Sequence, residues 1–105
     1  MYCRKKCNEL MDGLGFKESY RGTDYFRTGV AMVCAKRNIS MTKELYPALA
    51  RATDTTPAAV ERSMRAALEA ATESPMWDHN WRSLGGWDHP TNNEVLRRLA
   101  REMEE

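Results

Sequence analysis

Apolar residues recur every three or four positions in several long stretches of this chain, and no stretch alternates between apolar and polar residues as a half-buried strand does. The clearest stretch carries a stripe made of Val60, Met64, Ala67, Leu68 and Ala71. The opposite side of the same segment holds Ala58, Ala59, Arg62, Arg65, Ala66 and Glu69. One face of such a helix packs and the other faces solvent. The pattern predicts an all-α fold, a compact bundle of five to six helices.

A helix start signal stands directly before that stripe. The Thr56 hydroxyl can accept from a free N–H of the first turn, and Pro57 suits the first helical position because it has no N–H to leave unpaired. Upstream, Thr42 is a candidate N-cap for a shorter helix. Pro47 inside that helix removes one backbone hydrogen bond, so we expect the helix to start late or to bend. Its apolar positions are Leu45, Leu49 and Ala52.

Residues 40–73 therefore contain two helices, spanning 42–73, with only the short polar run 53–55 near their junction. Helices joined so closely must cross at a steep angle. This is the helix-turn-helix arrangement, whose second helix can enter the DNA major groove. Many helical hairpins have a short turn and an arginine-bearing face without binding DNA. The pattern alone thus leaves the function of the pair open.

Helices are also expected on both sides of this pair. An amphipathic helix over residues 2–14 should end at Gly15, and residues 23–37 are apolar nearly all round, which is typical of a central helix. Gly29 in that helix indicates a close helix crossing. Thr91 and Glu94 form a capping box that starts the last helix. The buried face of the last helix is predicted to be Val95, Leu96, Leu99, Ala100 and Met103.

The segment between residues 74 and 90 holds all three tryptophans, Trp77, Trp81 and Trp87. We expect them to pin a loop and a short helix onto the core, because most tryptophan side chains are largely buried. The alternative is an exposed aromatic patch that contacts a protein partner. Trp-Asp-His occurs twice here, at residues 77–79 and 87–89, but two copies of three residues are too short to indicate a repeat.

Composition indicates one globular domain, because 105 residues with 42% hydrophobic and 30% charged positions suffice for a modest core. The 16 basic and 15 acidic residues give a net charge of only +1, which does not indicate nucleic-acid binding. Charge placement softens this point, since Glu102, Glu104 and Glu105 lie in the C-terminal tail, away from the helical pair. No apolar run is long enough for a membrane span or a signal peptide, so we expect a soluble cytoplasmic protein.

The residues that could carry chemistry form no known catalytic or metal-binding pattern. Cys3, Cys7 and Cys34 are odd in number, which fits a reducing compartment. We interpret Cys3 and Cys7 as small apolar core residues near the frayed start of the first helix. Their spacing relative to His79 and His89 matches no established zinc pattern, so we expect no metal site and no cofactor. Asp78 and Asp88 lack a catalytic context, and we expect no enzymatic activity.

Several strings resemble, in order and spacing, the C-terminal DNA-binding domain of the sporulation initiation regulator, stage-zero sporulation protein A. The likeness extends from about Leu10 to Ala100. The strings are Tyr25-Phe26-Arg27, Ala31-Met32-Val33, Thr42-Lys43-Glu44-Leu45-Tyr46-Pro47, Thr55-Thr56, Val60-Glu61-Arg62, Arg65 and Pro90-Thr91-Asn92-Asn93-Glu94. The resemblance implies a response-regulator effector domain of six helices that binds a short duplex DNA element as a tandem or dimeric pair and contacts RNA polymerase through another surface.

The resemblance also assigns roles to residues of the second helix of the pair. Arg62 and Arg65 match family arginines that face DNA, and Glu61 matches an acidic residue of the same face. Arginine can read guanine or hold phosphate, and glutamate can accept from cytosine. Ala59 stands where the family typically has an arginine and Ala66 where it often has a histidine, so we expect the affinity for DNA to fall and the target sequence to differ. Candidate phosphate contacts are Lys43, Arg51 and Thr56.

The 105 residues include no phosphate-accepting receiver domain, so we expect constitutive action, or control through expression level or a partner. Two hypotheses follow. In the first, the chain is a sequence-specific transcription regulator whose helix 57–73 enters the major groove. In the second, it is a non-enzymatic protein-interaction module of the same fold that has lost effective DNA reading and binds a relative or RNA polymerase.

Overall fold

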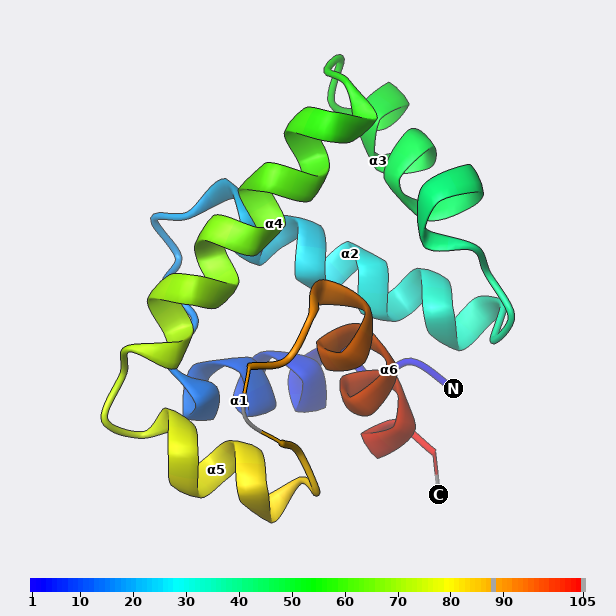
Figure 1. The fold of residues 1–105 in the computed structure, drawn as a ribbon. Helices are drawn as coiled ribbons and strands as arrows, with labels where there is room; N and C mark the ends of the chain where they lie inside the picture. The colour runs from blue at the N-terminus through cyan, green and yellow to red at the C-terminus, as the bar shows by residue number, and fades with distance from the viewer. Residues whose placement is uncertain (88, 105) are drawn as a thin grey trace.

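Six α-helices and one short π-helical turn make up the chain in the computed structural model, which describes residues 1–87 and 89–104 (Figure 1). Within those residues there is no strand, which confirms the predicted all-α class. In chain order the elements are α1 (Arg4–Leu14), α2 (Arg21–Ala35), η1 (Met41–Leu45), α3 (Tyr46–Ala52), α4 (Pro57–Thr72), α5 (Trp77–Ser83) and α6 (Asn92–Glu102). The radius of gyration is 12.6 Å, close to the roughly 13 Å expected for a compact chain of about 100 residues.

Helix α2 runs through the middle of the molecule and packs against α1, α4 and α6 (Figure 1). Its Gly29 lies so close to α6 that a Cβ there would stand 2.9 Å from the Leu96 Cδ2, which confirms the predicted close crossing. A second close approach was not expected. A Cβ at Gly22 would overlap the backbone carbonyl of Ser63 on α4, so glycine is required where α2 begins against α4.

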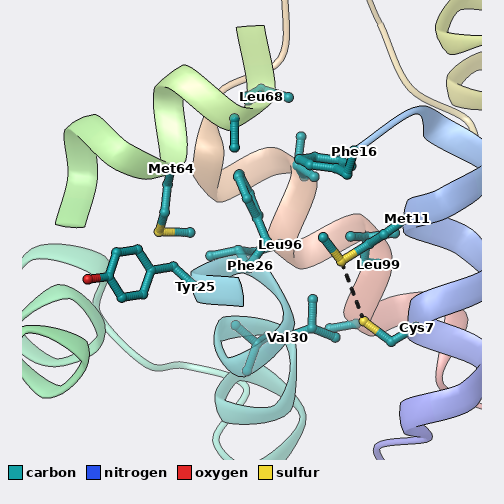
Figure 2. Close-up of a cluster of buried hydrophobic side chains, with 14 of the residues drawn as sticks. Cys7, Met11, Phe16, Tyr25, Phe26, Val30, Met64, Leu68, Leu96 and Leu99 are labelled. Atoms are coloured by element: carbon teal, nitrogen blue, oxygen red, sulfur yellow. Dashed lines mark hydrogen bonds between the residues drawn. The ribbon is translucent and has the colours of Figure 1, made fainter. Parts of the chain in front are cut away.

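The core lies between α1, α2, α4 and α6, and Figure 2 shows their buried side chains meeting there. Phe16 joins this core to α5, because its ring centroid lies 5.1 Å from that of Phe26 and 6.2 Å from that of Trp77. Trp77 in turn stacks on Trp81 at 5.2 Å. Both of these tryptophans are buried and pin α5 to the core as expected. Trp87 departs from that expectation, with 75% of its surface exposed.

Helix α1 ends as the sequence predicts, at Gly15 with φ of 96°. Its buried positions are Cys7, Met11 and Leu14, whereas Cys3 is exposed. The expectation that Cys3 is a core residue is therefore wrong. The physical reason is that Cys3 precedes the first helical turn, where its extended backbone carries it off the apolar stripe.

Capping decides where three helices begin. Thr56 accepts from the Ala59 N–H, and Thr91 and Glu94 form the complete capping box, so both predictions are confirmed. The Thr42 cap is wrong, because Ser40 accepts from the Lys43 N–H and its own N–H donates to Glu44. Pro47 has no N–H to give, and the chain winds as a π-turn before it. This wide turn moves the cap two residues upstream.

Two predicted features fall on residues that the structure leaves out. Asp88, in the second Trp-Asp-His string, and Glu105, in the acidic tail, lie outside the described residues. Across the part of the chain that is described, no helix is both long and apolar enough to cross a membrane.

Candidate nucleic-acid interface

Helices α3 and α4 pack against each other and are joined by residues 53–56, at the top of Figure 1. The turn is held from both sides. The Thr55 N–H donates to the Ala50 carbonyl at 2.9 Å, and the Thr53 hydroxyl lies 3.0 Å from the Tyr25 hydroxyl on α2. Asp54 takes the left-handed conformation, with φ of 55°, which aspartate tolerates better than most residues. The start of α4 is therefore fixed relative to α2 and α3.

Helix α4 separates its residues into two faces as predicted. The five apolar positions of the stripe from Val60 to Ala71 are all buried. Arg62 and Arg65 are exposed, and Arg62 makes no ion pair with any described residue. A helix with one packed face and one solvent face is the element that fits the DNA major groove, which is about 12 Å wide. The outward face of α4 is thus available to a large ligand.

The two arginines differ in their surroundings. Arg65 donates to the Glu61 carboxylate at 3.1 Å, one helical turn away. Their side chains are 54% and 34% exposed, so this is a surface ion pair of small energy. One of the five N–H donors of Arg65 is occupied by this contact, and the others remain open to a base or a phosphate.

The three candidate phosphate contacts are exposed but do not lie together. Arg51, in the last turn of α3, and Thr56, the cap of α4, flank the turn at the top of Figure 1. Thr56 uses an oxygen lone pair for its cap, so its hydroxyl hydrogen stays free to donate. Lys43 belongs to η1, at the opposite end of the pair's first helical segment. A DNA phosphate backbone that contacts all three residues must run along the length of this helical segment.

A groove of about 710 Å³ adjoins α4, between η1 and the start of α6. Glu61, Arg65 and Glu69 form its α4 wall, and Thr91 and Asn93 stand opposite. The groove was not predicted, because its walls are separated by about thirty positions in the sequence and meet only in the fold. It brings the start of α6 next to the arginine-bearing face of α4.

Asn92, the first residue of α6, connects α6 to α4. Its side chain is 7% exposed, and its Nδ2 donates to the Glu61 carbonyl at 3.3 Å and to the Tyr46 hydroxyl at 3.4 Å. Burial raises the pKa of Tyr46, so this hydroxyl stays protonated. The Asn92 Oδ1 has no partner among the described residues. No sequence signal marks this contact, since an asparagine after a Thr cap reads as an ordinary surface residue.

The remaining predicted residues lie off the arginine-bearing face of α4, although Trp77 contributes to the wall of the groove beside it. Trp77 and Trp81 belong to α5 and are buried on its core-facing side. Of the three predicted protein-contact tryptophans, Trp87 alone is on the surface. Cys7 donates weakly to the Met11 sulfur at 3.8 Å, and burial raises the pKa of its thiol. No three metal-ligating side chains cluster within residues 1–87 and 89–104.

The comparison with known families agrees with this geometry. Residues 7–103 match the family described as sporulation initiation factor Spo0A, C terminal. The match covers nearly the whole chain, including α3, the turn and α4, and it confirms the resemblance found in the sequence strings. The family is one of DNA binding and transcription regulation in sporulation initiation. The chain therefore belongs to the family of the Spo0A C-terminal domain.

Proposed function

We propose that this chain is a sequence-specific transcription regulator whose α4 enters the major groove of duplex DNA as the second helix of a helix-turn-helix. The observation that carries the proposal is the pairing of exposed Arg62 and Arg65 with a fully buried stripe on the same 16-residue helix. A helix held by its buried face presents its arginines in a fixed direction. Such preorganisation lowers the cost of ordering long side chains on binding.

Each residue of the site has a distinct role in this proposal. Arg62 and Arg65 read guanine O6 and N7 or hold phosphates, and Glu61 accepts from cytosine N4 or orients Arg65. Arg51, Thr56 and Lys43 contact phosphates and set the register of α4 on the duplex.

Ala59 and Ala66 flank the arginines on α4, so this face has few polar groups for base reading. With a net charge of only +1, the chain also has little general attraction for DNA. We therefore expect moderate affinity that falls steeply with salt, since phosphate contacts release counterions.

The test is a binding series against duplexes selected from a random pool, measured by fluorescence anisotropy. Arg62→Ala and Arg65→Ala should each weaken binding by about 1–3 kcal/mol. Arg4→Ala is the matched control, because Arg4 is an exposed arginine on α1, away from the proposed site. If Arg4→Ala weakens binding as much as the α4 variants, α4 is not the reading helix.

The second candidate function is a protein-interaction module that has lost effective DNA reading. The observation in its favour is Trp87, which is 75% exposed and is the kind of residue that dominates protein interfaces. In this candidate the partner is RNA polymerase or a full-length relative, within the cytoplasm, whereas pairing with a second copy on DNA belongs to the first candidate. Sequence-selective, salt-sensitive DNA binding by the isolated chain would rule this candidate out.

A further inference from the structure

A second groove, of about 410 Å³, lies on a part of the molecule that the DNA proposal does not use. It is bounded by the end of α2, the α5–α6 connection and the outer side of α6. Arginine dominates its described lining, which includes Arg37, Arg97, Arg98 and Arg101 together with Trp87 and Glu94.

The walls of this groove are held in place. Trp81 donates from its indole Nε1 to the Trp87 carbonyl at 2.6 Å, which fixes the backbone beneath the exposed Trp87 ring. Gly86 packs directly against the Trp81 ring, where a Cβ would overlap the indole. On the other side, Arg97 donates to the carbonyls of Arg37 and Ile39, at 2.5 and 2.6 Å. Arg97 is thus a structural clamp between α6 and the end of α2.

Two guanidinium groups remain available after these contacts are counted. The guanidinium groups of Arg98 and Arg101 form no ion pair or hydrogen bond with any residue that the structure describes. Arg37 is paired with Glu104. Among the described residues of the lining one is acidic, Glu94, and its carboxylate accepts from the Thr91 N–H in the capping box at 2.8 Å. The groove is therefore cationic, with an exposed indole at its edge.

We propose that this groove binds an acidic segment of another protein, in which carboxylates meet Arg98 and Arg101 and an apolar side chain lies on Trp87. Guanidinium groups form bidentate, charge-assisted bonds with carboxylates. Tryptophan and arginine are also the residues most enriched at interface hot spots. The volume falls in the range of small-ligand pockets, about 300–1,000 Å³, which admits a few side chains but not a duplex.

This site is separate from the α4 surface, since its residues belong to the end of α2, the α5–α6 connection and α6. The proposal consequently does not depend on DNA reading by Arg62 and Arg65. It adds a way for a partner to bind while α4 is occupied.

The experiment begins with a random peptide library displayed on phage and selected on the whole chain. A synthetic peptide of the enriched sequence is then titrated against the wild type, Trp87→Ala and the double variant Arg98→Gln/Arg101→Gln. Arg62→Gln is the matched control. Thermal unfolding checks that each variant folds. We expect Trp87→Ala to fold because the bond from Trp81 is made to the Trp87 backbone carbonyl, which the substitution keeps.

We expect enriched peptides with several aspartate or glutamate residues around an apolar one. The groove variants should weaken binding of the synthetic peptide about tenfold or more, and Arg62→Gln should leave it unchanged. Enrichment without acidic residues overturns the proposal, as does binding that the groove variants do not affect. A single-stranded oligonucleotide that binds the groove more tightly than the peptide also overturns it.

Discussion

The carboxylate of Glu61 accepts a hydrogen bond from the guanidinium of Arg65 across one turn of α4, at 3.1 Å. Each partner also faces the groove between α4 and α6. The contact holds one edge of the Arg65 guanidinium group against α4, so its remaining N–H donors point in a restricted set of directions. We therefore expect Glu61 to bias the direction from which Arg65 meets a ligand.

The first prediction concerns this pair. Glu61→Gln removes the charge that orients Arg65, so discrimination between a selected and an unrelated duplex should fall, while affinity for the unrelated duplex rises. Protein stability should change by less than about 0.5 kcal/mol, as for other surface pairs at this spacing. Anisotropy titrations with both duplexes measure the ratio. Glu69→Gln is the control, because it removes the same charge from α4 without touching Arg65; an equal loss of discrimination there would contradict the assigned role.

The second prediction concerns three helical glycines whose neighbours differ. Gly22→Ala meets the Ser63 backbone carbonyl, which cannot move cheaply, and should destabilise the protein by about 1–3 kcal/mol. Gly29→Ala meets the end of the flexible Leu96 side chain, so its strain should roughly cancel the gain in helix propensity. Gly13→Ala finds only ordinary contact, 3.8 Å from the Asn80 Nδ2, and should stabilise α1.

Urea unfolding of the three variants ranks them directly. The expected order of stability is Gly13→Ala, then Gly29→Ala, then Gly22→Ala. A Gly22→Ala protein as stable as the wild type would mean that α2 and α4 do not approach as closely as the structure shows.

The third prediction tests the cap of η1. Ser40→Ala removes the acceptor for the Lys43 N–H and should cost about 1 kcal/mol, the usual value for a helix cap. Thr42→Ala should have little effect, because the Thr42 hydroxyl has no partner among the described residues. Thermal unfolding of the two variants distinguishes them. An equal loss of stability in both would mean that Ser40 is not the cap.

The fourth prediction is a pH dependence. The Lys36 ammonium, and secondly the Ser40 N–H, hold the pKa of Glu44 below its usual 4.5. A depressed folded-state pKa contributes stability that is present above the unfolded value and is lost as pH falls through the folded one. Stability should thus fall below about pH 4.5, and Glu44→Gln should flatten this fall. Urea midpoints measured from pH 6 to pH 3 provide the test; an unchanged slope in Glu44→Gln would assign the acid sensitivity to other carboxylates.

Local signals in the sequence predicted much of the fold. Thr56 with Pro57 marked the start of α4, and Thr91 with Glu94 marked the start of α6, because both caps depend on residues within one turn. The close crossing at Gly29 was also predictable. A glycine in the interior of an apolar helix is unfavourable for helix formation, so close packing of another helix is the expected reason for it. The Ser40 cap was missed because it depends on the π-turn that precedes Pro47, which no periodicity reveals.

The candidate site was predicted only in part. The exposure of Arg62 and Arg65 follows from the apolar stripe on α4, which fixes the opposite face. The contact of Asn92 with the Glu61 carbonyl could not be predicted, because it joins residues that are 31 positions apart and requires α6 to dock on α4. The cationic groove was missed for the same reason, although the spacing of Arg97 and Arg101 places both on the polar side of α6.

The most direct test of the account is to map a selected DNA duplex onto the isotope-labelled protein by amide chemical-shift perturbation. If α4 reads the major groove, the largest shifts should fall on the outward positions from Ala58 to Glu69, with smaller ones at the turn and Arg51. Shifts centred on α5, the α5–α6 connection or the outer side of α6, with α4 unaffected, would contradict it.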